Sequence, residues 1–240
     1  MNRRSFLHTA GLASLASLAG GELALAAGVL PTEASGELGS YGDFLERNGL
    51  LVAQGPSMIP VQPAPFAVTE DNIEGPYFRN GAPTRFLITQ PYEPGVVMVI
   101  RGRVWGFDTK KPIPNATMHI WQADENGRYD NDDPRKPPAP DVFINRGIIF
   151  TDARGAYEYQ TIHPGAYQIG PRAWRPAHVH YMVLAPGYET LTTQLYFDGD
   201  PHNATDQFIK PSLIIKLHSD QRHRRRFEKG VFDIVLKPTP

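Results

Sequence analysis

The sequence predicts an all-β protein, an antiparallel β-sandwich with long irregular loops. From Val96 onward, short runs rich in β-branched and aromatic residues alternate with turn segments such as 108–112 and 152–155. No long helical periodicity competes with these runs. The expected strands are VVMVIRGRVW at 96–105, ATMHIWQA at 116–123, GIIFTD at 147–152, AYEYQTI at 156–162, AHVHYMVLA at 177–185, LTTQLYF at 191–197 and VFDIVL at 231–236.

One long stretch between the expected strands has no regular pattern. In Asp130 to Val142, eight of the thirteen residues are Pro or Asp, so neither a strand nor a helix is expected there. Loops of this length without structure of their own are usually functional or mobile.

The N-terminal segment differs in character from the rest. It reads MNRRSFLHTAGLASLASLAGG and then ELALAAG, so an arginine pair precedes a short apolar run and a small-x-small pattern. Residues 1–26 therefore resemble a twin-arginine export signal, and we expect export to the periplasm or the exterior. The apolar run is shorter than the roughly 20 residues that a bilayer span needs, so no permanent membrane span is expected. Such signals often carry folded proteins with a cofactor already inserted, which hints at a bound metal.

Two further segments complete the expected organisation. Residues 27–66 are rich in Gly, Pro, Ser and Ala, and we expect a leader or wrapping arm with one short helix near 41–48. Residues 67–240 contain the expected strands and form the sandwich domain.

Charge and composition exclude several classes of function. The chain has 24 Lys and Arg against 25 Asp and Glu, a net charge of −1, which gives no electrostatic footprint for nucleic acid or an anionic membrane. The one dense basic run, 222–226, is short and close to Glu228, so it is expected to be solvated surface. The chain has no cysteine, which excludes disulfides, Cys-based zinc sites, iron–sulfur clusters and thiol nucleophiles. Any metal must be held by His, Tyr, Asp or Glu.

The stretch WRPAHVHYMV, 174–183, contains a histidine pair inside an expected strand. Because side chains alternate along a strand, His178 and His180 point the same way, with Cα atoms roughly 6.5 to 7 Å apart. Two imidazoles at this spacing suit a metal, but a lone histidine is more often an ordinary core or surface residue, and periodicity alone leaves both interpretations open. Tyr129 and Tyr167 lie where expected strands pass into loops, and each taken alone is as well explained as a packed aromatic.

Five motifs in order resemble one enzyme family. They are NIEGPYFRNGAP (72–83), GRVWGFDTKKPIPNATMHIWQADENGRYDN (102–131), TDARGAYEYQTIHPGAY (151–167), WRPAHVH (174–180) and LTTQLYFDGDP (191–201). Over about 72–236 the chain is similar to the intradiol ring-cleavage dioxygenases, the catechol and protocatechuate dioxygenase family. The resemblance implies that 67–240 is a catalytic domain and that its irregular loops carry a metal site.

Carried over residue by residue, the resemblance implies one non-haem Fe(III) per chain. The family's ligands fall on Tyr129, Tyr167, His178 and His180, with Tyr167 and His180 axial. Two tyrosinates place hard, negative oxygen on the ion, which favours Fe(III) over Fe(II) or zinc.

The resemblance also implies roles around the substrate. Arg175 is expected to stabilise negative charge on the substrate ring, although a salt bridge across the sheet is an alternative for it. Gln194 is expected to orient the substrate or Arg175. Ile73 and Pro76 are expected to line the substrate pocket, and a turn at Gly75-Pro76 explains that segment nearly as well.

The implied reaction inserts both atoms of O₂ into a small catechol-type diol and opens the ring between the two hydroxylated carbons, giving a cis,cis-muconate-type diacid. Tyr167 is expected to leave the metal when the diol chelates and to act as one of two bases. An alternative is a non-catalytic, transthyretin-like binding module, and a hydrolase with another metal lacks an obvious carboxylate ligand. The motifs divide between the catechol and protocatechuate branches, and both a monomer and a homo-oligomer are compatible with the sequence.

Overall fold

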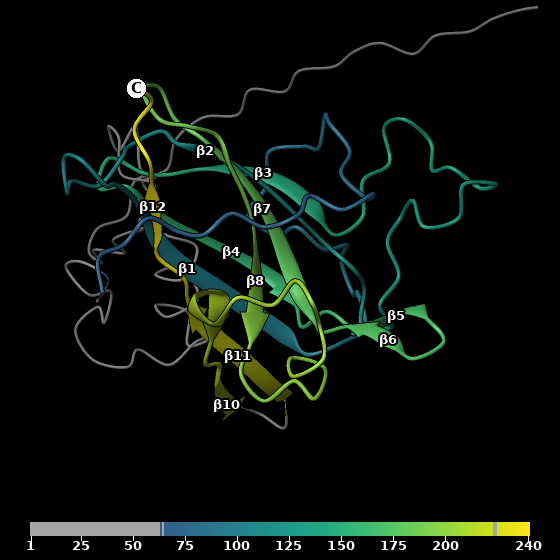
Figure 1. Ribbon diagram of the computed structural model, residues 1–240. Helices are drawn as coiled ribbons and strands as arrows, with labels where there is room; N and C mark the ends of the chain where they lie inside the picture. The colour runs from purple at the N-terminus through teal and green to yellow at the C-terminus, as the bar shows by residue number, and fades with distance from the viewer. Residues whose placement is uncertain (1–62, 64, 223–224) are drawn as a thin grey trace, which may run out of the picture. The chain divides into compact units, whose positions relative to one another are not determined.

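The part of the chain that the structure describes contains twelve β-strands and one 3₁₀ turn. The strands form two main sheets and a two-stranded hairpin (Figure 1). The structure is a computed structural model that describes residues 63, 65–222 and 225–240. The expected export signal at 1–26 and the expected helix near 41–48 lie outside the described residues. The strands are β1 Val97–Gly106, β2 Thr117–Gln122, β3 Arg146–Phe150, β4 Ala156–Ile162, β5 Tyr167–Gly170, β6 Ala173–Arg175, β7 His178–Leu184, β8 Leu191–Phe197, β9 Ile214–Ile215, β10 His218–Arg222, β11 Arg225–Val231 and β12 Ile234–Leu236, and the 3₁₀ turn η1 is Pro211–Leu213.

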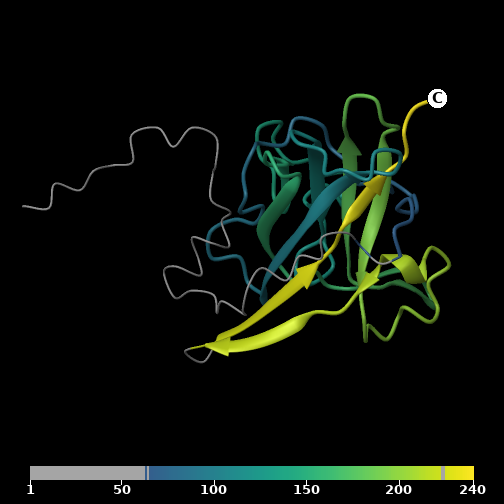
Figure 2. The same ribbon diagram turned by 90° about the vertical axis from the view of Figure 1, so that its left-hand side faces the viewer.

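The first sheet has the order β10-β11-β1-β12, with β4 on the other edge of β1, and the second has the order β3-β2-β7-β8-β9. The predicted all-β sandwich is confirmed by this architecture. Its sheets are mixed rather than purely antiparallel, because β1 pairs in parallel with β11 and then with β12, and β8 pairs in parallel with β9. Figure 2 shows the returning C-terminal strands lying along β1.

Alternation along the strands places one face of each sheet in a shared core. Val179, Tyr181 and Val183 of β7 are buried in one core cluster with Met98 and Ile100 of β1. Each fully buried side chain of this size contributes about 1.5–3 kcal/mol relative to an exposed one. The neighbouring residues of β7, including the two histidines, therefore point to the other face of the second sheet.

The structure differs from the predicted strands at the C-terminus. The expected strand 231–236 is split, because β11 ends at Val231 and β12 begins at Ile234. At this break the Asp233 carboxylate accepts the backbone N–H of Arg103 at 2.8 Å. Residues 223 and 224 of the basic run lie outside the described residues, and its Arg226, in β11, is exposed and pairs with Glu228 at 2.7 Å.

The irregular loop predicted between β2 and β3 is present, with turns but no strand or helix over 130–142. Within the described residues, no helix is long and apolar enough to cross a membrane.

Candidate metal centre

The residues predicted to hold a metal lie on the outer face of the second sheet, away from the sandwich core. Strand pairing sets Trp121 of β2, His180 of β7 and Gln194 of β8 in one row across the sheet. In the next row, His178 lies opposite Tyr196 of β8. Because side chains alternate along a strand, all five share one face.

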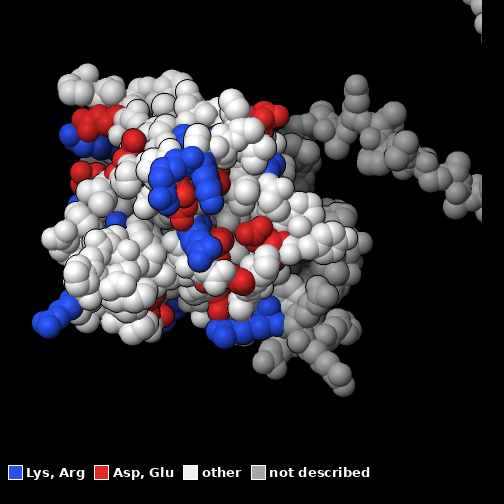
Figure 3. Space-filling view, turned by 90° about the vertical axis from the view of Figure 1, so that its right-hand side faces the viewer, with Lys and Arg blue, Asp and Glu red and all other residues white. Residues whose placement is uncertain are grey.

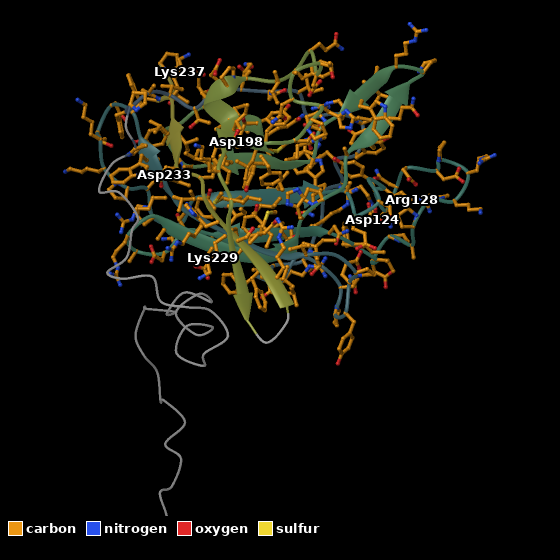
Figure 4. All side chains as sticks on the ribbon, turned by 90° about the horizontal axis from the view of Figure 1, so that it is seen from below. Asp124, Arg128, Asp198, Lys229, Asp233 and Lys237 are labelled. Atoms are coloured by element: carbon orange, nitrogen blue, oxygen red, sulfur yellow. The ribbon has the colours of Figure 1, made fainter. Side chains whose placement is uncertain are left out.

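Tyr129 reaches this face from the loop that follows β2. The loop begins with a turn in which the Asp124 carboxylate accepts the backbone N–H groups of Asn126 and Arg128, both at 2.8 Å. Figure 4 shows Asp124 and Arg128 next to each other. The ring of Tyr129 then stacks on Tyr77, with centroids 4.1 Å apart. The turn and the stacking together fix the position of the phenol.

A buried ion cluster anchors the same loop. The side chain of Asp130 is 1% exposed and bonds Arg79 at 2.8 Å and the buried Arg146 at a shorter distance. Arg146 also donates to the carbonyl oxygen of Tyr77 at 2.5 Å. One guanidinium therefore ties together the residue that follows Tyr129 and the residue on which Tyr129 stacks.

Tyr167 arrives from a different part of the chain, at the start of the β5–β6 hairpin, where its backbone pairs with Arg175. The loop before Tyr167 packs closely on the Tyr129 loop. Gly127 allows this approach, because its φ is +77° and a Cβ there would lie 2.5 Å from the carbonyl oxygen of Ala166. Glycine at this position is thus needed to bring the two tyrosines together.

The four predicted ligands converge on one point. The Tyr129 hydroxyl lies 3.1 Å from Nε2 of His180 and 3.4 Å from Nε2 of His178, and the two Nε2 atoms are 3.1 Å apart. The ring of Tyr167 packs edge-on against that of Tyr129, with centroids 5.8 Å apart, and its centroid lies 5.7 Å from that of His178. Side chains from β7, from the start of β5 and from the loop after β2 therefore present two nitrogens and two oxygens to a common centre.

Both histidines are neutral in this setting. Burial, with a further contribution from Arg175, lowers the pKa of His178 to about 3. Burial, His178 and Arg175 lower the pKa of His180 well below its ordinary value. Nδ1 of His178 lies 2.6 Å from the carbonyl oxygen of Pro176, and since a carbonyl only accepts, Nδ1 carries the proton and Nε2 carries a lone pair.

Hydrogen bonds alone do not satisfy this arrangement. Nδ1 of His180 is buried and has no hydrogen-bond partner among the described residues. If the proton of His180 is on Nε2, its Nδ1 is a buried acceptor without a donor. If the proton is on Nδ1, that N–H is a buried donor without an acceptor, and the Nε2 lone pairs of His178 and His180 face each other at 3.1 Å. A cation held between both Nε2 atoms and the phenol oxygens removes the conflict at Nε2.

The tyrosines also fit a strongly charged ion. Burial, with a contribution from Tyr167, raises the pKa of Tyr129 well above its usual value, and burial likewise raises the pKa of Tyr167. These phenols ionise only beside a strong positive charge, as other acidic ligands do on metals. The described residues contain no group of three or more His, Cys, Asp and Glu side chains that could hold a metal. The donor set is therefore two imidazoles and two phenols, which suits a hard, highly charged cation.

The other predicted site residues lie around this centre. Nε2 of Gln194 donates to the carbonyl oxygen of Ile73 at 2.7 Å. Ile73, 38% exposed, lines a cavity of about 360 Å³ together with residues 71, 72 and 207–210. Pro76 is exposed and is not among the residues that line this cavity. Gly75 has a φ of +71°, which agrees with a turn at Gly75-Pro76.

Several residues that contact the site had no signal in the sequence. They are Tyr77, Trp121, Asp130, Arg146, Tyr196 and Asp206. The aromatic ones fall in runs that read equally well as core, and the charged ones fall in loops or at a strand end, where exposure is the rule. Only the three-dimensional structure places them beside the four predicted ligands.

The β-sandwich brings two tyrosines and two histidines together at the outer face of one sheet. This fold and donor set indicate a non-haem metalloenzyme. The profile of a protein family described as "Dioxygenase" matches residues 73–238. The chain belongs to this dioxygenase family, and its predicted resemblance to the intradiol enzymes is confirmed.

Individual relatives agree with this assignment. Catechol 1,2-dioxygenase 2 of Acinetobacter lwoffii is 37% identical over 150 residues, covering 56% of this chain and 53% of the relative. Chlorocatechol 1,2-dioxygenase of Rhodococcus opacus is 34% identical over 191 residues, covering 70% and 72%. The solved dioxygenase domain of a dioxygenase carbohydrate-binding protein fusion from Streptomyces sp. SirexAA-E is 36% identical with a TM-score of 0.59, covering 72% of this chain and 100% of that one. The chain thus spans about half the length of the first of these relatives.

Proposed function

We propose that this chain binds one Fe(III) through Tyr129, Tyr167, His178 and His180 and acts as an intradiol dioxygenase. It inserts both atoms of O₂ into a catechol-type diol and cleaves the ring between the two hydroxylated carbons, giving a cis,cis-muconate-type diacid. Relatives named for catechol and chlorocatechol support a small aromatic diol as the substrate.

One observation carries the proposal. The Tyr129 hydroxyl lies within 3.4 Å of the unprotonated Nε2 of His178 and 3.1 Å from Nε2 of His180, and the ring of Tyr167 packs against that of Tyr129 with centroids 5.8 Å apart. A folded core has no other use for such a cluster, because it leaves buried polar groups unpaired. Fe(III) held by these residues would be a Lewis acid that the two diol oxygens can chelate, and it would make the diol ring reactive toward O₂.

The two tyrosines have different tasks. Tyr129 is buried and stacked on Tyr77, so it stays in place. Tyr167 is half-buried at the start of a hairpin whose next two residues are exposed, so its side chain has room to move. We assign to the oxygen of Tyr167 one of the two protons that a diol gives up on chelation.

Arg175 supplies fixed positive charge beside the reacting ring. It is 3% exposed, and its charge lowers the pKa of Tyr129, Tyr167, His178 and His180, so it acts on all four residues. A cation in a dry pocket stabilises negative charge more strongly than it does in water. Gln194 accepts a hydrogen bond from Nη2 of Arg175 at 2.5 Å and so helps to hold this charge in the pocket.

The chain's own side chains keep water from the buried side of the site. Tyr77 and Phe78 pack against a cluster formed by Trp121, Ala123 and Tyr129. On the face in Figure 3, positive and negative side chains are interspersed rather than gathered into one field, which suits a small diol better than a highly charged polymer.

Metal analysis and colour test the proposal directly. Purified protein is expected to contain about one iron per chain, to show burgundy tyrosinate-to-iron absorption, and to consume O₂ and catechol in equal amounts. Tyr129→Phe is expected to abolish colour and turnover. The matched control Tyr159→Phe removes another buried hydroxyl, one that pairs with Tyr181 in the sandwich core, and is expected to keep both. Protein that stays colourless and inactive after Fe(III) loading would contradict the proposal and restore the binding-module alternative.

We further propose that residues 1–26 direct export by the twin-arginine route. The support is the sequence itself, with Arg3 and Arg4 before the apolar run. Fusing these residues to a reporter that is active only outside the cytoplasm is expected to give signal, and replacing both arginines with lysine is expected to abolish it. A signal unchanged by that replacement would contradict this route.

A further inference from the structure

The guanidinium of Arg175 makes hydrogen bonds to three side chains and lies over an aromatic ring. Its Nε donates to Asp206 at 3.1 Å, and its Nη2 donates to Gln194 at 2.5 Å and to Tyr196 at 3.1 Å. The ring of Phe208 lies 4.8 Å from Cζ. Within the described residues Nη1 has no hydrogen-bond partner, so it is the nitrogen left to meet a substrate.

Asp206 is the charged member of this set and is itself firmly fixed. Its side chain is 1% exposed. One carboxylate oxygen accepts the backbone N–H of Phe208 at 3.2 Å, and its own N–H donates to the carbonyl oxygen of His202 at 3.1 Å. Among the described residues Arg175 is its one ion-pair partner.

The neutral partners are arranged around the same pair. The Tyr196 hydroxyl donates to Oε1 of Gln194 at 2.8 Å and accepts Nδ2 of Asn72 at 3.3 Å. Gln194 in turn donates to Ile73. Both neutral partners bond the same nitrogen, Nη2, so Asp206 alone fixes the Nε edge and thereby the rotation of the guanidinium plane.

The orientation of a buried guanidinium and its distance from the substrate decide how strongly it stabilises the transition state. A misplacement of about 1 Å can cost about 100-fold in rate, because preorganised charge acts only where charge develops in the transition state. An arginine that lost its buried carboxylate would also be drawn toward solvent, since an unpaired buried charge is costly.

We infer that Asp206 is a positioning residue, which fixes the guanidinium of Arg175 so that Nη1 faces the charge developing on the substrate ring. This inference rests on the proposed function. The competing interpretation is that the ion pair only stabilises the 198–210 loop. The two differ in a measurable way: a positioning residue acts through Arg175 and loses its effect when Arg175 is gone, whereas a stabilising residue does not.

A double-mutant cycle on the iron-loaded full chain separates the two interpretations. Turnover of catechol is measured for the wild type, Asp206→Asn, Arg175→Gln and the double variant, with single turnovers at excess enzyme for the slow variants. Asp206→Asn is expected to lower kcat by about 10- to 100-fold while KM changes by less than about twofold. In the Arg175→Gln background the same substitution is expected to change kcat by less than about twofold.

Asp233→Asn is the matched control. Asp233 is a partly buried carboxylate that, like Asp206, accepts a backbone N–H, and in Figure 4 it lies far from the Asp124–Arg128 turn that leads to Tyr129. It is expected to change kcat by less than about twofold in both backgrounds. Thermal unfolding is recorded for every variant. If Asp206→Asn does not fold, Asp206→Glu replaces it, since that side chain keeps the ion pair but displaces Nε.

The outcomes separate this inference from the function on which it rests. A wild type that binds iron but cleaves no catechol would overturn both. Two results with an active wild type would overturn the positioning role and leave the proposed function intact. In the first, Asp206→Asn lowers kcat by the same factor whether or not Arg175 is present. In the second, Asp206→Asn changes only KM and the unfolding temperature.

Discussion

The indole of Trp121 stacks on the imidazole of His180, with ring centroids 4.8 Å apart and planes 7° from parallel. The two residues face each other across β2 and β7. His180 has no hydrogen-bond partner for Nδ1 among the described residues, so stacking takes over the task that a second hydrogen bond usually performs for a metal-binding histidine. The plane of this ring, and hence the direction of its Nε2 lone pair, depends on Trp121.

Replacing Trp121 with leucine is therefore expected to weaken iron retention by about tenfold, the lower end of what partners of metal ligands contribute. Competition with a chelator measures this. Trp105→Leu is the matched control, because Trp105 is equally buried but lies in β1 of the other sheet. Both variants are expected to lose stability, and only Trp121→Leu to lose iron. Equal chelator sensitivity in the two variants would contradict the role given to the stack.

The strands that position this site were predictable, because each depends on a local pattern. Alternation in β7 placed His178 and His180 on one face, and the structure has them there. The pairing of β1 with β11 and β12 in parallel was not predictable, since burial patterns do not record strand direction. Tyr129 and Tyr167 were found through family motifs. Asp206 had no signal, because its burial results from a loop packing on residues 31 positions away in sequence.

Gly127→Ala tests the contact between the two tyrosine loops. The backbone at Gly127 has a positive φ, and the added Cβ would clash with the carbonyl oxygen of Ala166. A strained backbone of this kind costs about 1–3 kcal/mol, and the clash is expected to push Tyr129 and Tyr167 apart. Gly187→Ala is the control, because its φ is +82° with nothing within 4 Å of the added atom. Similar losses of unfolding free energy are expected from strain in both, with loss of burgundy colour only in Gly127→Ala. Retained colour and iron in Gly127→Ala would contradict this account of the loop contact.

In the cluster of Arg79, Asp130 and Arg146, replacing different members is expected to lower the unfolding free energy by different amounts. Removing Asp130 leaves two guanidinium groups without their carboxylate, one of them fully buried, and is expected to cost about 3–5 kcal/mol of unfolding free energy. Removing Arg79, whose side chain is 17% exposed, leaves Asp130 still paired with Arg146, and is expected to cost about 1 kcal/mol or less. Urea denaturation of Asp130→Ala and Arg79→Ala measures both. An Arg79→Ala loss equal to that of Asp130→Ala would contradict the arrangement.

The two site histidines predict how the stability of iron-free protein depends on pH. Folding lowers the pKa of His178 from about 6.5 to about 3 and that of His180 in the same direction. Between these values the unfolded chain binds protons that the folded chain does not, so the unfolding free energy falls as pH falls from about 6.5 toward 3, by about 1.4 kcal/mol per pH unit for each histidine.

Urea denaturation of iron-free protein at several pH values between 7 and 4 measures this slope. His178→Asn removes one titrating group, so its slope is expected to be smaller than that of the wild type by about one proton. Bound iron is expected to be released over the same range, because protons compete for the nitrogens that hold it. Identical slopes for the wild type and His178→Asn would mean that His178 is already protonated in the folded chain, which would contradict its assignment as a neutral metal ligand.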